Sequence, residues 1–159
     1  MNGRIVGAGL ILVAALSGLV MYYLQVYGFY EPVDQVTGVQ ELAFTDANGA
    51  PHPLPVAGFA GIDAASSPLR YRACFTLTPS ALTEGAGYDA PTPLNGPKWF
   101  QCYNARALTE DLASGAARAY LGTRNIHPGI DRVIAVYPDG RAFAWHQLNE
   151  SAEEKKVIE

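Results

Sequence analysis

The chain has 159 residues, of which 49% are hydrophobic and 16% are charged, and its formal net charge is −4. About 125 residues remain after the N-terminal apolar segment, enough for one domain with a hydrophobic core and too few for two. Arg4 is the one basic residue before Glu31, so the rest of the chain is net acidic, which excludes nucleic acid as the main partner because phosphate binding needs a cationic face.

The segment Ile5–Tyr30 contains no charged side chain. Its apolar part, Ile5–Leu24, has about 20 residues, the length that crosses a hydrocarbon core of about 30 Å. A cleavable signal peptide is the alternative, but its apolar region is usually about 7–15 residues and ends at small residues. Here strongly apolar Leu19–Leu24 directly follows the small residues. We therefore predict an uncleaved transmembrane anchor over residues 1–30.

Two features of this segment predict how it lies in a membrane. Its C-terminal end carries an aromatic collar, which we define as Tyr22, Tyr23, Tyr27, Phe29 and Tyr30. Aromatic rings of this kind lie at headgroup level, so we expect the collar at the membrane interface. Arg4 flanks the other end, and no basic residue follows the segment until Arg70. The positive-inside rule then predicts a cytoplasmic N-terminus and a domain on the outer side of the membrane.

Small side chains are frequent within the apolar segment: Gly7, Gly9, Ala14, Ser17 and Gly18. Small residues at spacings such as Ala14/Gly18 let a second helix approach closely in lipid. The alternative is that Gly and Ala are simply common in membrane helices. We expect these residues to form a helix-packing face toward another integral membrane protein.

Between Glu31 and Pro97 the pattern predicts short strands joined by loops, because Gly and Pro are frequent and apolar runs are brief. The predicted segments are a linker at Glu31–Gln35, a strand at Val36–Phe44, an extended piece at Pro51–Pro55, a loop or helical turn at Gly58–Pro68, a strand at Tyr71–Leu77 and a surface loop at Thr78–Pro97.

The C-terminal half predicts one helix and one hairpin. Asn104–Tyr120 repeats apolar residues every four positions, and Asn104 can cap its N-terminus. Arg132–Tyr137 and Arg141–Leu148 flank Pro138-Asp139-Gly140, a turn sequence typical of a hairpin. The fold class predicted is α+β, with a small antiparallel sheet packed on one main helix over residues 31–149 and a charged tail over 150–159.

The two cysteines, Cys74 and Cys102, predict one structural disulfide, since two cysteines in an exported domain are most simply joined. A redox-active pair or metal ligands are the alternatives, but there is no Cys-x-x-Cys and no adjacent His.

His127, Asp131 and His146 are the candidates for a polar site. The alternative is that His127 and Asp131 belong to a connection in which Asp131 pairs with a neighbouring arginine. Arg70 and Arg72 alternate, so on a strand they share one face, where they pair with acidic neighbours or bind an anion. A metal site needs three or four converging ligands, and no nucleophile, phosphate-loop or haem motif is found. We therefore expect no catalytic residues, no metal and no cofactor.

The segments MNGRIVGAGL, MYYLQVYGFYE, GIDAASSPLRYRACFT, WFQCYNA, GTRNIHPGIDRVIAVYPDGR and WHQLN resemble a group of small alphaproteobacterial membrane proteins with one span and a domain of unknown function. The resemblance extends from Met1 to Asn149. It implies an anchored bacterial protein with a periplasmic domain, and it implies no activity.

These features predict a non-catalytic accessory or assembly subunit of a larger membrane complex, such as a respiratory or photosynthetic one. Its partners are then the lipid bilayer and an integral membrane protein complex, contacted through the helix and the domain. A stand-alone periplasmic binding or sensing module is the alternative, and a periplasmic enzyme is a weaker one.

Overall fold

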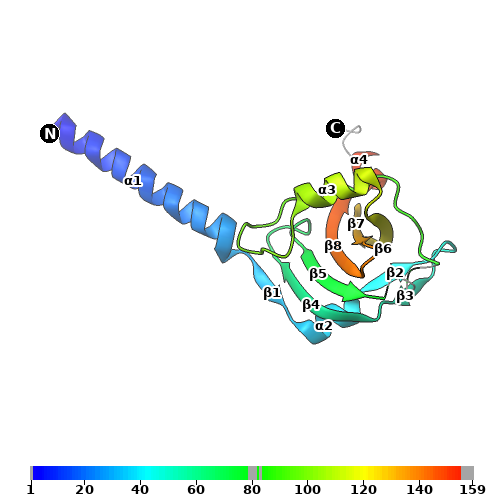
Figure 1. The fold of residues 1–159 in the computed structure, drawn as a ribbon. Helices are drawn as coiled ribbons and strands as arrows, with labels where there is room; N and C mark the ends of the chain where they lie inside the picture. The colour runs from blue at the N-terminus through cyan, green and yellow to red at the C-terminus, as the bar shows by residue number, and fades with distance from the viewer. Residues whose placement is uncertain (1, 79–81, 83, 155–159) are drawn as a thin grey trace.

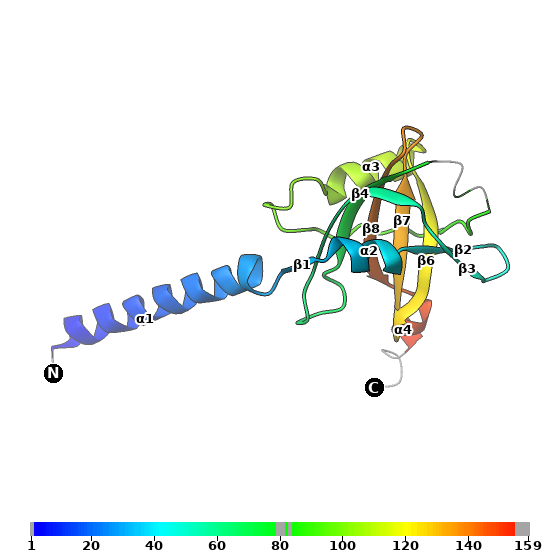
Figure 2. The same cartoon turned by 90° about the horizontal axis from the view of Figure 1, so that it is seen from below.

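The computed structural model describes residues 2–78, 82 and 84–154. It has an N-terminal helix that projects as a rod from one side of a domain built around an antiparallel sheet (Figure 1). The view from below shows that the helix leaves the domain without packing along it (Figure 2). The predicted α+β class, with a long apolar helix before the sheet, is confirmed.

The rod consists of helix α1 (Gly3–Tyr23) and a π-helical turn η1 (Leu24–Gly28). Asn2 caps its start by accepting a hydrogen bond from the backbone N–H of Arg4. It is long and apolar enough to cross a membrane, and none of its described residues is buried inside the protein. Only Phe29 and Tyr30 separate the rod from the first strand.

The main sheet has six strands in the order β1-β4-β5-β8-β7-β6, and every neighbouring pair is antiparallel. The strands are β1 (Glu31–Val33), β4 (Val56–Asp63), β5 (Arg72–Leu77), β8 (Arg141–Leu148), β7 (Ile130–Val136) and β6 (Arg118–His127). A second, two-stranded sheet joins β2 (Ala43–Thr45) to β3 (Pro51–Pro53). It lies beside β6, where the Thr45 hydroxyl donates to the Gly122 carbonyl at 2.7 Å.

Both faces of the main sheet are covered. One face packs with residues of helix α2 (Gln35–Glu41), of the chain that follows it and of the β2–β3 hairpin, in a core that includes Leu42, Phe44 and Leu54. The other face packs against helix α3 (Ala105–Ser114) in a core centred on Trp145. All residues of β7 are consequently buried. A short helix, α4 (Glu150–Glu154), follows β8 and occupies part of the predicted tail.

The later elements match their predictions closely. Strand β5 and the β7–β8 hairpin lie where the pattern places them. The Asn104 side chain accepts a hydrogen bond from the Ala107 N–H at 3.2 Å and caps α3, as predicted. The helix is nevertheless shorter than predicted. It ends at Gly115, whose left-handed conformation (φ 80°) terminates helices, and the chain then enters β6 instead of continuing as helix.

Three predictions in the first half are wrong. The predicted linker contains β1, an edge strand paired with β4, where Pro32 is tolerated at the sheet edge. The predicted strand Val36–Phe44 begins as α2, because Asp34 accepts hydrogen bonds from the Val36 and Thr37 N–H groups and caps a helix.

The third wrong prediction is the loop at Gly58–Pro68, most of which is strand β4. Its glycines mark a bulge and a close contact within a strand, not a loop. The register shifts between Ala57 and Ala60, and Gly58 lies there at φ 61°. At Gly61 a Cβ would lie 2.6 Å from the Phe59 ring, so only glycine fits beside that ring.

Candidate functional site

The end of the N-terminal helix is bound by two side chains of the domain. The Trp99 indole N–H donates to the Val26 carbonyl at 2.7 Å. The Arg70 guanidinium donates to the Gln25 side-chain oxygen at 3.1 Å and to the Gln25 carbonyl at 3.5 Å. The last carbonyls of a helix have no partners within it, and a cation there also complements the helix dipole. These four residues, which we call the junction, fix the helix to the domain.

Aromatic stacking extends the junction. The Trp99 ring stacks on Tyr27 with centroids 6.4 Å apart and meets Tyr30 edge-on at 5.9 Å. The Arg70 guanidinium lies 5.3 Å from the Tyr30 ring centroid. The Trp99 ring of the domain therefore packs against Tyr27 and Tyr30, two members of the predicted aromatic collar. Trp99 was not among the residues predicted from the sequence, although it lies in the aromatic-rich segment Trp99-Phe100-Gln101-Cys102-Tyr103.

A disulfide holds the segment that carries Trp99. Cys74 on β5 is bonded to Cys102, and their Cα atoms lie 6.2 Å apart. Because Cys102 is only three residues beyond Trp99, the bond attaches the capping side chain to a central region of the sheet.

Of the three residues of the predicted polar site, the structure brings together His127 and His146, whose ring centroids lie 6.2 Å apart, but not Asp131. Asp131 is 1% exposed, and its carboxylate accepts hydrogen bonds from the Asn125 N–H at 2.9 Å and the Asn149 amide at 2.7 Å. It therefore fixes the β6–β7 turn and forms no ion pair with an arginine in the part of the chain that the structure describes. Arg132, the next residue along β7, points to the opposite face, where it binds His146. Asp131 and His146 thus lie on different faces of the sheet.

His146 is buried in a polar cluster with Arg132 and Tyr71. Its Nε2 accepts from the Arg132 guanidinium at 3.1 Å, so its Nδ1 carries the proton and donates to the Pro68 carbonyl at 2.7 Å. The Tyr71 ring stacks on the imidazole, with centroids 4.6 Å apart. Burial, together with the charge of Arg132, lowers the pKa of His146 from 6.5 to about 3. A buried histidine held neutral in this way is suited to stabilise the fold.

Arg70 and Arg72 do not share a strand face as predicted, because β5 begins only at Arg72. Arg72 is buried and donates to the carbonyls of Leu94 at 2.8 Å and Asn95 at 2.9 Å, whereas Arg70 points to the junction. Neither arginine forms an ion pair with a carboxylate among residues 2–78, 82 and 84–154. The expectation of acidic partners is wrong because backbone carbonyls satisfy Arg72 and the helix end satisfies Arg70.

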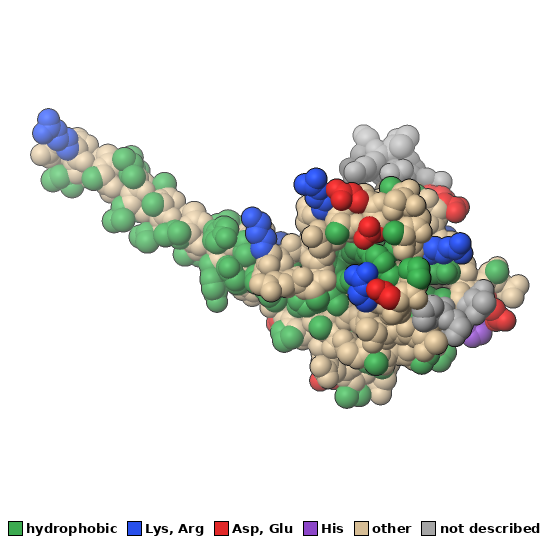
Figure 3. Space-filling model, viewed as in Figure 1, with side chains coloured by type: hydrophobic (Ala, Val, Ile, Leu, Met, Phe, Trp, Pro, Cys, Tyr) green, Lys and Arg blue, Asp and Glu red, His purple; other side chains and the backbone are tan. Residues whose placement is uncertain are grey.

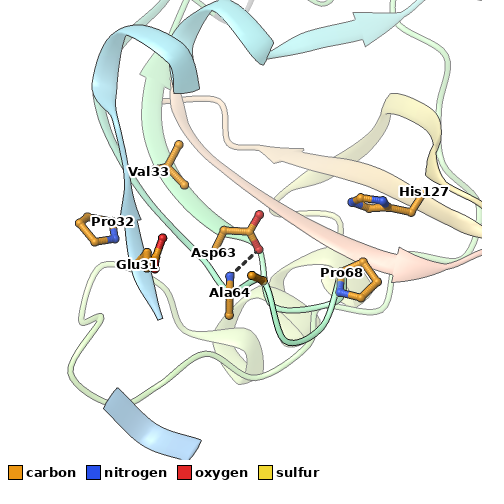
Figure 4. A pocket seen from close by; sticks show the side chains of 8 residues that line it. Glu31, Pro32, Val33, Asp63, Ala64, Pro68 and His127 are labelled. Atoms are coloured by element: carbon orange, nitrogen blue, oxygen red, sulfur yellow. Dashed lines mark hydrogen bonds between the residues drawn. The ribbon is translucent and has the colours of Figure 1, made fainter. Parts of the chain in front are cut away.

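An open pocket of about 470 Å³ lies beside β1, and His127 forms its far wall (Figure 4). Glu31 and Asp63 face each other across the β1–β4 pair and line it with Pro68. One oxygen of Asp63 accepts from the Ala64 N–H at 2.8 Å. In the described parts of the chain, no three His, Cys, Asp or Glu side chains are placed to hold a metal ion.

The small residues of α1 do not all lie on one side of the helix. At about 100° per residue, Ala14 and Gly18 lie within about 20° of Gly7, whereas Ser17 lies about 80° and Gly9 about 160° away around the helix. A Cβ added at Gly7, Gly9 or Gly18 would meet no atom within 4 Å. Gly7, Ala14 and Gly18 therefore form one open side, and Gly9, which was predicted to belong with them, lies opposite.

Comparison with known proteins identifies a family. Residues 42–156 match a family described as a family of unknown function, DUF6446. The matched segment starts at the end of α2 and contains every strand except β1. No curated protein and no solved structure matches the chain. Since the match covers most of its length, the chain belongs to DUF6446, a family of unknown function.

Proposed function

We propose that the protein is a non-catalytic accessory or assembly subunit of a larger membrane protein complex, such as a respiratory or photosynthetic one. In this proposal α1 spans a bacterial inner membrane once, the N-terminus is cytoplasmic and the domain is periplasmic. The observation that carries the proposal is the junction, in which Arg70 and Trp99 fix the domain to the end of the helix.

A fixed junction favours a subunit over a simply tethered domain. A tether requires only a flexible connection, whereas here β1 follows the helix almost at once and is paired within the sheet. Helix and domain then present one continuous surface of defined geometry. A neighbouring membrane protein can contact both parts of such a surface at the same time, which lowers the entropy cost of association.

The surface of α1 supports the same proposal. Its exposed side chains are almost entirely apolar, apart from the basic side chain of Arg4 near the N-terminal tip (Figure 3). The open side formed by Gly7, Ala14 and Gly18 would let a partner helix approach its backbone, and close packing is what drives helix association in lipid.

The test is purification of the tagged full chain from its native membranes in mild detergent, with identification of the proteins that come with it. We expect Gly7→Leu and Gly18→Leu to lose most of the partner, because a bulky side chain separates the helices. Gly9→Leu is the matched control: it makes the same chemical change on the opposite side and should retain the partner. Equal retention by all three variants would show that the helix does not bind.

A binding or sensing module is the second candidate. The pocket beside β1 favours it, because Glu31 and Asp63 place two carboxylates opposite each other at one rim, an arrangement suited to a cationic ligand. If the wild-type chain purifies from native membranes without any partner, the subunit proposal fails and this second function gains support.

A further inference from the structure

The contacts that Trp99 makes in the junction do not account for its exposure. Its indole N–H already donates to the Val26 carbonyl, and its ring packs on Tyr27 and Tyr30, yet the residue remains 39% exposed. The other tryptophan, Trp145, is fully buried in the core. The exposed part of Trp99 lies beside the end of an apolar helix that is itself uncovered.

The position of Trp99 along the helix corresponds to the headgroup layer of a bilayer. The apolar run ends at Leu24, and Trp99 binds the carbonyl of Val26, two residues or about 3 Å farther along the axis. The headgroup layer extends about 5–7 Å beyond the hydrocarbon on each side. Tryptophan is enriched at this depth because its ring is apolar and its N–H is polar.

Basic side chains flank the same place. Lys98 is exposed and precedes Trp99, while Arg70 lies over the Tyr30 ring, against which Trp99 also packs. Figure 3 shows basic atoms where the helix meets the domain. In an otherwise acidic domain, a lysine and an arginine beside an exposed tryptophan form a group that matches the phosphates and the apolar edge of a phospholipid layer.

The loop that presents this group is held in place before any lipid binds. The Phe100 N–H donates to the Pro97 carbonyl at 2.9 Å and closes a turn around Lys98 and Trp99. The disulfide at Cys102 then joins the turn to β5. Little conformational entropy is left to lose, which favours binding by a small surface.

From these observations we propose that Lys98, Trp99 and Arg70 form a second membrane contact, made by the domain itself with phospholipid headgroups beside α1. The proposal rests on the membrane anchoring in the proposed function. It adds a lipid-binding surface from residues far from the helix in sequence, and it places this side of the domain against the bilayer.

The experiment is quenching of tryptophan fluorescence in the full chain, reconstituted in vesicles of phosphatidylcholine and phosphatidylglycerol that contain spin-labelled lipids. Trp145 is shielded from both lipid and water, so the change between wild type and Trp99→Phe reports Trp99 alone. We expect a spin label at the headgroup to quench wild-type emission several-fold more than a label at the bilayer centre. This quenching should vanish in Trp99→Phe.

The charge on Lys98 is tested in the same vesicles. Lys98→Glu should reduce headgroup quenching when phosphatidylglycerol is present and change it little in phosphatidylcholine alone, because attraction to anionic lipid is lost. An equal effect in both lipids would overturn the role assigned to the lysine.

Flotation of the vesicles separates this proposal from the anchoring on which it rests. If the chain floats with the vesicles after alkaline washing but Trp99 is quenched only by aqueous iodide, the lipid contact is refuted and the anchor stands. Trp99 would then face water and be free for a protein partner. If the chain does not float, the anchoring itself fails.

Discussion

Replacing both cysteines, as Cys74→Ser with Cys102→Ser, is expected to lower the free energy of unfolding by about 3.5 kcal/mol. The bond closes a loop across a sequence separation of 28 residues, and its removal restores that freedom to the unfolded chain. The loss is large compared with the total stability of about 5–15 kcal/mol that is usual for a domain. It is measured by urea unfolding of the full chain in a mild non-ionic detergent, followed by Trp145 fluorescence.

The same variant should also affect the junction, because Cys102 holds the turn that carries Trp99. We expect iodide to quench Trp99 more strongly in the serine variant than in the wild type before any unfolding. Ala113→Ser is a suitable control, since Ala113 is exposed on α3 and takes no part in the disulfide. A serine variant as stable as the wild type would contradict a structural role for the disulfide.

Acidification is expected to destabilise the protein through His146. Its pKa is about 3 in the folded protein and 6.5 as the ordinary value, so between these values the unfolded chain binds the proton and the folded chain does not. The contribution of neutral His146 to the free energy of unfolding is therefore complete above pH 6.5 and is lost as the pH falls toward 3. The slope approaches about 1.4 kcal/mol per pH unit, or about 3 kcal/mol between pH 6.5 and 4.

The main cause is the burial of the imidazole, followed by the charge of Arg132, which disfavours a second positive charge beside it. The Arg132 guanidinium also donates a hydrogen bond to Nε2, which a protonated imidazole cannot accept. Urea unfolding at several pH values measures the effect. His146→Gln is the matched control, because glutamine keeps a donor and an acceptor but does not titrate in this range. A wild type and variant with the same pH slope would show that His146 is not held neutral.

Elements with a strong local signal were predictable from the sequence. The β7–β8 hairpin has its turn residues at Pro138–Gly140, and Asn104 marks the start of α3. The end of α3 also had a local signal at Gly115, but the apolar period continued through Ala116 and Tyr120 and concealed it. Tyr120 belongs to β6, where it pairs with Ile134.

The errors arose where long-range packing decides the conformation. Val36 and Val39 favour a strand by propensity, yet Asp34 caps a helix there and Gly38 lies against Phe59. The extended form of Glu31–Val33 depends on pairing with β4, some thirty positions later in the chain. Nothing in the short segment itself indicates that partner.

The junction could not be predicted for the same reason. Trp99 and Val26 are 73 residues apart, and Arg70 and Gln25 are 45 residues apart. Charge alone suggested carboxylate partners for Arg70 and Arg72, because it does not reveal which backbone carbonyls the fold leaves unpaired. The polar group of His127, Asp131 and His146 was selected by residue type, and strand alternation then separates Asp131 from His146.

We propose that one helix anchors the chain in the membrane and that the domain lies on its outer side. Two reporters fused after Glu159 measure this directly in living cells: an enzyme that folds only in an oxidising compartment, and a fluorescent protein that matures only in the cytoplasm. We expect an active enzyme and a dark fluorescent protein. A bright fluorescent protein with an inactive enzyme would place the domain in the cytoplasm and refute the proposed orientation.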